Sequence, residues 1–335
     1  MIVILKKALV VATILALSAL IVFGLSRAFV YLTRPAPEPV NVVIKPGFST
    51  AEIAENLSQA GLVDNAVLFK LYIIRNGAET RIKAGEYRLK TGLSYKDVLT
   101  LLLKGPKTKY YSVTIPEGFT LREIAGVIGS KTHVSGEEFL RFANKDYYDL
   151  FFLSEIPTDN LEGYLFPKTY LITERMNAHD VVKMMLLQFQ KEVSPLDFTW
   201  AKARNLGLHQ IVTVASMIEE EVKIPEERSE VAAVIYNRLN GGMPLQIDAT
   251  VQYALPERKS ELTYDDLKVP SPYNTYLNPG LPPGPITSPG LASIQAALKP
   301  ANVDYLYYVL TGADGSHTFT SSYDEFSKIK EERGR

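Results

Sequence analysis

The chain has 335 residues, of which 46% are hydrophobic, and it carries 36 basic against 37 acidic side chains. A chain of this size can bury a full core and is long enough for more than one domain. The balanced charge argues against nucleic acid as the main partner, and a neutral or sugar-like substrate fits better. Cysteine is absent, which excludes disulfides, thiolate metal sites, a cysteine nucleophile and a bacterial lipoprotein anchor.

Histidine is also scarce. The four histidines stand at positions 133, 179, 209 and 317, with no HExxH motif and no close pair among them. Zinc enzymes depend on such closely spaced ligands. We therefore expect no metal, and nothing in the sequence calls for a cofactor.

An apolar run at residues 8–25 has eighteen positions without a charge, which is long enough to span a bilayer. Lys6 and Lys7 precede it, so the positive-inside rule puts the short N-terminus in the cytoplasm and the remaining chain outside. A cleaved signal peptide is the alternative, but the run is long for one and lacks a clean small-x-small cleavage site. We predict a cytoplasmic tip and single-pass transmembrane helix over residues 1–34.

An internal repeat follows the proline-rich spacer. The segment VVIKPGFSTAEIAENL at Val42 reappears 71 residues later as VTIPEGFTLREIAGVI at Val113. Each copy predicts a strand, a glycine turn and a helix whose Ser or Thr N-cap is followed three residues later by Glu, so we interpret these glutamates as structural. The unit resembles LysM modules, which bind peptidoglycan glycans; an ordinary α+β spacer is the alternative. The predicted fold class is α+β, with a linker and LysM-like module at 35–108 and a larger catalytic domain at 109–335 that begins with the second copy.

Three consecutive glutamates end a predicted helix that starts near Ile211. At 100° per residue, Glu220 points away from the apolar stripe and is expected to face solvent. Glu219 and Glu221 fall on the two flanks of the stripe, where burial can raise the pKa of a carboxyl group. A carboxyl group with a raised pKa is a candidate general acid, and periodicity alone leaves these two flanking residues equal.

Three further segments contain candidate cleft residues. LEGYLFPKTY, residues 161–170, sets Glu162 among aromatic residues, a mixture typical of a cleft wall, although the aromatics could equally fill the core. MPLQIDATVQYAL predicts a strand with Gln246, Asp248 and Thr250 on one face. A proline-rich stretch, residues 271–290, holds a rigid loop that contains Tyr273 and Asn274.

Carboxylic acids, amides and tyrosines suit glycoside chemistry, because an acid must protonate the leaving oxygen while aromatic faces and amides bind sugar rings. A hydrolase needs a second carboxylate, for which Glu162 and Asp248 are the candidates, and each could equally serve as a structural hydrogen-bond acceptor. A serine hydrolase is disfavoured, because no G-x-S-x-G motif occurs.

Several ordered motifs together resemble one family, the YceG-like endolytic murein transglycosylases (MltG), over nearly the whole chain. The motifs are ASMIEEE, VAAVIYNRL, LQIDATVQY, SPYNTY, GLPPGPI, LEGYLFPKTY and LYYVLTGADGSHTF. The resemblance implies a lyase of the inner (cytoplasmic) membrane with an extracytoplasmic or periplasmic catalytic part, located near the peptidoglycan synthases. It also implies Glu219 as the catalytic residue. Lys168 is a departure, since that position is often acidic in the family.

Such enzymes cut nascent peptidoglycan strands between MurNAc and GlcNAc, form 1,6-anhydroMurNAc ends and so terminate strand elongation. The resemblance implies that one glutamate acts first as acid and then as base, while the muramic C6 hydroxyl attacks the anomeric carbon. The expected cleft residues are Glu162, Gln246, Asp248, Tyr273 and Asn274. Two alternatives stay open, a hydrolytic muramidase and a non-catalytic peptidoglycan-binding scaffold.

Overall fold

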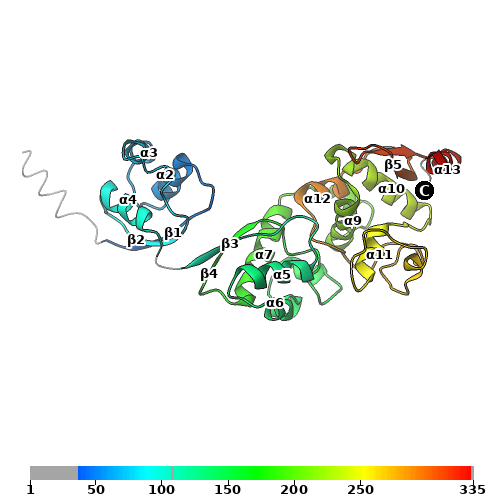
Figure 1. Ribbon diagram of the computed structural model, residues 1–335, viewed down its shortest axis with the longest axis horizontal. Helices are drawn as coiled ribbons and strands as arrows, with labels where there is room; N and C mark the ends of the chain where they lie inside the picture. The colour runs from blue at the N-terminus through cyan, green and yellow to red at the C-terminus, as the bar shows by residue number, and fades with distance from the viewer. Residues whose placement is uncertain (1–36, 107–108, 333–335) are drawn as a thin grey trace, which may run out of the picture. The chain divides into compact units, whose positions relative to one another are not determined.

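The computed structural model describes residues 37–106 and 109–332 (Figure 1). The chain divides into two compact units, residues 1–108 and 109–335, and its architecture is mixed α+β with small two-stranded sheets. The predicted membrane anchor at residues 1–34 lies outside the described residues. Within the described ranges, no helix is both long enough and apolar enough to cross a membrane.

The first unit is a small α+β module with a core of its own. Strands β1 and β2 pair antiparallel in full register, from Pro39 opposite Lys90 to Ile44 opposite Gly85. Leu57, Phe69 and Leu102 are fully buried and come from three different helices, so all three helices contribute to one core. The described elements in chain order are β1 (Pro39–Ile44), α2 (Thr50–Gln59), α3 (Ala66–Arg75), β2 (Gly85–Lys90) and α4 (Tyr95–Lys104).

The second unit is larger and mainly helical. Strand β3 pairs antiparallel with β4, and β5 pairs antiparallel with β6. Its elements are β3 (Tyr110–Thr114), α5 (Leu121–Lys131), α6 (Gly136–Phe142), β4 (Thr169–Thr173), α7 (Ala178–Val193), α8 (Thr199–Lys202), α9 (Leu208–Glu221), α10 (Arg228–Asn240), α11 (Asp248–Ala254), α12 (Leu291–Leu298), β5 (Tyr307–Leu310), β6 (His317–Thr320) and α13 (Tyr323–Glu332), with short 3-10 turns at 145–147, 151–155, 225–227 and 266–268.

Helix α9 is the centre of the second unit. Neighbouring helices α10, α11 and α12 pack against it, and every residue from Ile211 to Ile218 is buried (Figure 1). The periodicity predicted a single buried face, whereas the helix is enclosed along its length. A helix that is surrounded by other elements has no solvent face. The three glutamates at its C-terminal end therefore all contact neighbouring residues.

Both copies of the repeat form the local structure that their sequence predicts. Ser49 caps α2 and Thr120 caps α5, and in each case the glutamate three residues later bonds back to the capping residue's N–H, completing a capping box. The first copy belongs to the first unit and the second copy to the second unit. The same local signal therefore starts one helix in each unit.

The prediction of a strand at residues 243–255 was wrong. The segment forms a loop followed by helix α11. Thr250 is fully buried, where its hydroxyl lies 2.9 Å from the hydroxyl of Thr275, while Gln246 and Asp248 are exposed. The three side chains do not share a face. The alternation that suggested a strand belongs to a loop in which Leu245 and Ile247 are buried between exposed neighbours. This loop runs into the seven-residue helix α11, and period-two patterning does not distinguish such a segment from a strand over so short a stretch.

Candidate active site

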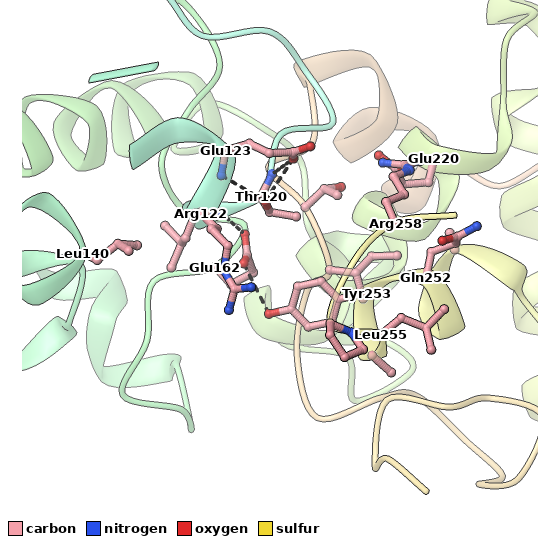
Figure 2. A pocket seen from close by; sticks show the side chains of 16 residues that line it. Thr120, Arg122, Glu123, Leu140, Glu162, Glu220, Gln252, Tyr253, Leu255 and Arg258 are labelled. Atoms are coloured by element: carbon pink, nitrogen blue, oxygen red, sulfur yellow. Dashed lines mark hydrogen bonds and ion pairs between the residues drawn. The ribbon is translucent and has the colours of Figure 1, made fainter. Parts of the chain in front are cut away.

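A cleft of about 610 Å³ opens in the second unit beside the end of α9 (Figure 2). One wall is the N-terminal turn of α5 together with Glu162, and the other is α11 with the loop that follows it. Its polar lining includes three carboxyl groups and two guanidinium groups, from Glu123, Glu162, Glu220, Arg122 and Arg258. Such a mixture of charged groups and apolar surface can bind a polar, partly charged polymer.

Glu162 is a buried acid in the wall of this cleft, with 5% of its surface exposed. Its Oε1 accepts the backbone N–H of Leu121 at 2.9 Å, and its Oε2 lies 3.2 Å from the hydroxyl of Tyr253 (Figure 2). Burial raises the pKa of Glu162 to about 8, and these two hydrogen bonds oppose the rise only in part. The carboxyl group is therefore protonated at neutral pH and can donate as well as accept a proton.

Glu220 lies in the opposite part of the lining, paired with Arg258 (Figure 2). The prediction that Glu220 faces solvent was wrong, because only 9% of its side chain is exposed. Burial raises the pKa of Glu220, while the charge of Arg258 and its hydrogen bond counteract that rise. The side chain of Arg258 is itself 58% exposed, so it remains accessible to a ligand in the cleft.

The other two glutamates at the end of α9 point elsewhere. The Oε2 of Glu219 accepts the backbone N–H of Gly290 at 2.8 Å, outside the residues that line the cleft. The Oε2 of Glu221 accepts the hydroxyl of Tyr308 at 3.0 Å, and burial raises the pKa of Glu221 to about 7 although this hydrogen bond acts against the rise. Three adjacent acids thus have three separate partners.

Comparison with known proteins identifies the family of this chain. The sequence model of the YceG-like family matches residues 42–332. The chain belongs to the YceG-like family. A protein of Bacillus subtilis (strain 168) named endolytic murein transglycosylase is 35% identical over 306 residues, which is 87% of this chain and 84% of the relative.

Two further relatives support membership of the YceG-like family. A protein of Streptococcus pneumoniae serotype 2 (strain D39 / NCTC 7466) with the same name is 32% identical over 317 residues, which is 86% of this chain but only 57% of the relative's length. The crystal structure of a YceG-like protein from Listeria monocytogenes superposes with a TM-score of 0.59 at 32% identity, covering 88% of this chain and 100% of that one.

The motifs that marked the YceG-like family contribute unequally to the cleft. In LEGYLFPKTY, Glu162 lines the cleft, whereas Tyr164, Phe166 and Tyr170 are buried in the core. Lys168 pairs with Glu192 at 2.8 Å on the surface, away from the cleft lining. The motif therefore contributes aromatic side chains to the core and one carboxyl group to the cleft.

Asn274 is a structural residue in this fold, which contradicts its prediction as a cleft residue. It is fully buried; its Nδ2 donates to the carbonyls of Leu267 and Val269, and its Oδ1 accepts the N–H of Tyr276. Every polar atom of the side chain is thus occupied in holding the proline-rich loop.

The remaining predicted residues lie around the cleft without lining it. Tyr273 packs against Tyr253, a cleft residue, with ring centroids 4.8 Å apart. Asp248 accepts the hydroxyl of Tyr276 at 2.5 Å, and Gln246 is exposed in a left-handed conformation with φ of 52°. Their contact with a glycan stays a prediction.

Sequence reasoning missed most of the lining, including the polar residues Thr120, Arg122, Gln252, Tyr253 and Arg258. Tyr253 carried a usable signal, because it stands four residues after Ala249 on α11 and so shares a helix face with it. Arg258 carried no such signal, because the sequence of a loop does not show which residue its charged side chain will contact. Within the described part of the chain, no group of three or more His, Asp or Glu side chains is placed to hold a metal ion.

Proposed function

We propose that this chain is an endolytic murein transglycosylase, a lyase that cuts peptidoglycan strands between MurNAc and GlcNAc and leaves 1,6-anhydroMurNAc ends. The observation that carries the proposal is membership of the YceG-like family over residues 42–332, together with relatives of this name at 35% and 32% identity. The cleft supports it, because acids, guanidinium groups and a tyrosine lie together in a space open to a glycan chain.

In the proposed reaction, Glu219 acts first as the general acid. Its protonated carboxyl gives a proton to the glycosidic oxygen as the bond to the anomeric carbon of MurNAc breaks, so that GlcNAc leaves as an alcohol. The resulting carboxylate then takes the proton of the muramic C6 hydroxyl, whose oxygen bonds to the anomeric carbon. The proton returns to Glu219 and no water is consumed.

The surroundings of Glu219 suit this double role. A single backbone N–H, from Gly290, bonds to one carboxyl oxygen and leaves the other without a hydrogen bond from any described residue. Glu220 and Tyr253 line the adjoining cleft, where they can contact the sugar rings and attached groups of the strand. Because the glycan supplies its own nucleophile, a second protein carboxylate is not required as a nucleophile.

Product analysis of the purified protein on peptidoglycan tests the proposal. We expect the wild-type chain to release anhydro-muramyl ends and Glu219→Gln to lose cleavage by at least about a hundredfold while still folding and binding glycan. Glu221→Gln is the matched control, since Glu221 bonds to Tyr308 and should contribute to packing.

Reducing muramic ends would instead establish a hydrolytic muramidase, and unchanged cleavage by Glu219→Gln would favour a glycan-binding scaffold. An equal loss of cleavage in both variants would contradict the assignment of catalysis to Glu219 and of packing to Glu221.

The proposal extends to location and glycan binding. The apolar run at residues 8–25 supports a single-pass anchor in the cytoplasmic membrane, with both units outside and near the peptidoglycan synthases. The first unit begins in the order strand–helix–helix–strand before α4, and this order supports a LysM-like glycan-binding module. We expect the full chain to stay with membranes through an alkaline wash, whereas a chain without residues 1–34 should be released. Release of the full chain would rule out the anchor.

A further inference from the structure

The turns before α2 and α5 differ at one informative position. In the alignment of the two repeat copies, Gly47 corresponds to Gly118, with φ of 83° and 77°, so both turns need glycine for a left-handed backbone. The residue before that glycine is Pro46 in the first copy and Glu117 in the second. Because the first turn forms without a glutamate there, the turn itself does not require Glu117.

The second turn is held against the end of α9. The N–H of Gly118 donates to the carbonyl of Ser288 at 2.9 Å, and the N–H of Ser288 donates to the carbonyl of Phe119 at 2.8 Å. A Cβ on Gly118 would lie 3.0 Å from the Oε1 of Glu220 and 3.9 Å from the Cγ of Glu219. This pairing brings Glu117 beside the proposed catalytic glutamate.

Glu117 and Glu219 both lie against Gly290, the residue that precedes α12. Glu219 accepts the N–H of Gly290, while an Oε1 of Glu117 occupies a point 2.0 Å from where a Cβ on Gly290 would be. The φ of Gly290 is −73°, which any residue adopts. A side chain at this position would therefore displace the Glu117 carboxyl group, although the backbone itself would accept any residue.

The charges around this pair favour a bound proton. Burial raises the pKa of Glu117, the negative charge of Glu219 raises it further, and Arg228 on α10 opposes both. Glu220 also interacts with the charge of Glu219. The negative charge of the nearby Glu219 therefore favours the protonated form of the Glu117 carboxyl group. Glu117 is exposed as a residue, so substrate can reach its carboxyl group.

We propose that Glu117 is a positioning residue of the glycan-cleaving site, whose carboxyl group, set against Gly290 by the docked turn, keeps Glu219 supplied with the proton that it gives to the leaving sugar. This inference rests on the proposed function, in which Glu219 is the general acid. It assigns to the second repeat copy a role that the first copy, with Pro46, does not have.

The test compares rates of anhydro-muramyl product formation as a function of pH for Glu117→Gln, Gly290→Ala and the double variant, all in the full chain. Glu117→Gln should lower the rate about tenfold and move the alkaline limb of the pH profile to lower pH, because the carboxyl group that holds a proton beside Glu219 is gone. Gly290→Ala should have the same effect, since its methyl group displaces only the end of the Glu117 side chain. Glu226→Gln, an exposed residue, is the control for charge removal.

In the double variant, Gly290→Ala should add nothing to Glu117→Gln, because both changes remove one interaction. A pH profile and rate for Glu117→Gln within twofold of the wild type would overturn the inference, and so would additive losses in the double variant. If the wild type released reducing ends, the proposed function would fail while the Glu117 comparison stayed valid for that reaction. A titration by ¹³C NMR needs no activity: Glu219→Gln must lower the pKa of Glu117, and an unchanged titration would overturn the inference.

Discussion

At the scale of single residues, the end of α9 shows how surroundings determine the chemistry of a carboxyl group. Glu219, Glu220 and Glu221 are adjacent and chemically identical, yet their partners are a backbone N–H, a guanidinium group and a phenol hydroxyl. The partners differ because successive helical residues point about 100° apart into different neighbours. Which acid can hold a proton near neutral pH is therefore a property of the packed site.

Glu162 yields a pH-dependent prediction at this scale. The pKa of Glu162 is raised from 4.5 in the unfolded chain to about 8 in the folded protein. Its contribution to stability is thus fully present below pH 4.5 and is lost as the pH rises through about 8. Glu162→Gln should remove this dependence and raise the free energy of unfolding, relative to the wild type, by roughly 2–4 kcal/mol at pH 8.5 and by far less at pH 5. Chemical denaturation at both pH values measures the difference.

The outcome that contradicts this prediction is a difference between wild type and Glu162→Gln that does not change with pH. Glutamine keeps an acceptor for the N–H of Leu121 and a donor for the hydroxyl of Tyr253, so packing is conserved in the comparison.

At the scale of elements, one local signal has two different consequences. The capping boxes of α2 and α5 are the same arrangement of hydroxyl and carboxylate. Thr120 and Glu123 also line the cleft, whereas Ser49 and Glu52 belong to the first unit and are not among the lining residues. The interpretation of the two capping glutamates as structural was therefore incomplete for the second copy. Local sequence specifies the cap, and the neighbours decide whether it also meets a ligand.

A matched pair of variants separates these roles. Ser49→Ala and Thr120→Ala should each cost about 1 kcal/mol of stability, because each removes one N-cap hydrogen bond. Only Thr120→Ala should also raise the KM for glycan, since Thr120 is part of the cleft wall. Urea denaturation and cleavage kinetics on the same preparations measure both effects. An equal change in KM for the two variants would refute the distinction.

At the scale of the whole molecule, two separate cores stabilise the chain. One contains Leu57, Phe69 and Leu102 in the first unit, and the other surrounds α9 in the second unit. Among the residues that the structure describes, none belongs to both core clusters. We therefore expect the two units to unfold independently.

Core truncation tests this independence. Leu57→Ala should destabilise the first unit and Leu186→Ala the second, each by about 2–5 kcal/mol, because both side chains are fully buried and leave a cavity. In calorimetry, each variant should shift only one of two transitions. A single transition that moves in both variants would show that the units unfold together.

The sequence by itself determined the local and chemical features of this protein. The glycine turns, the N-caps of α2 and α5, the acidic end of α9 and the family motifs all follow from residues close together in the chain. Only the tertiary structure decided which of these features meet. The cleft joins Glu162, Glu220 and Arg258, which are separated by dozens of residues, and tertiary packing set the side chain of Glu220, expected to face solvent, into the cleft wall beside Arg258. Periodicity describes one element at a time, whereas burial and partners depend on every element packed around it.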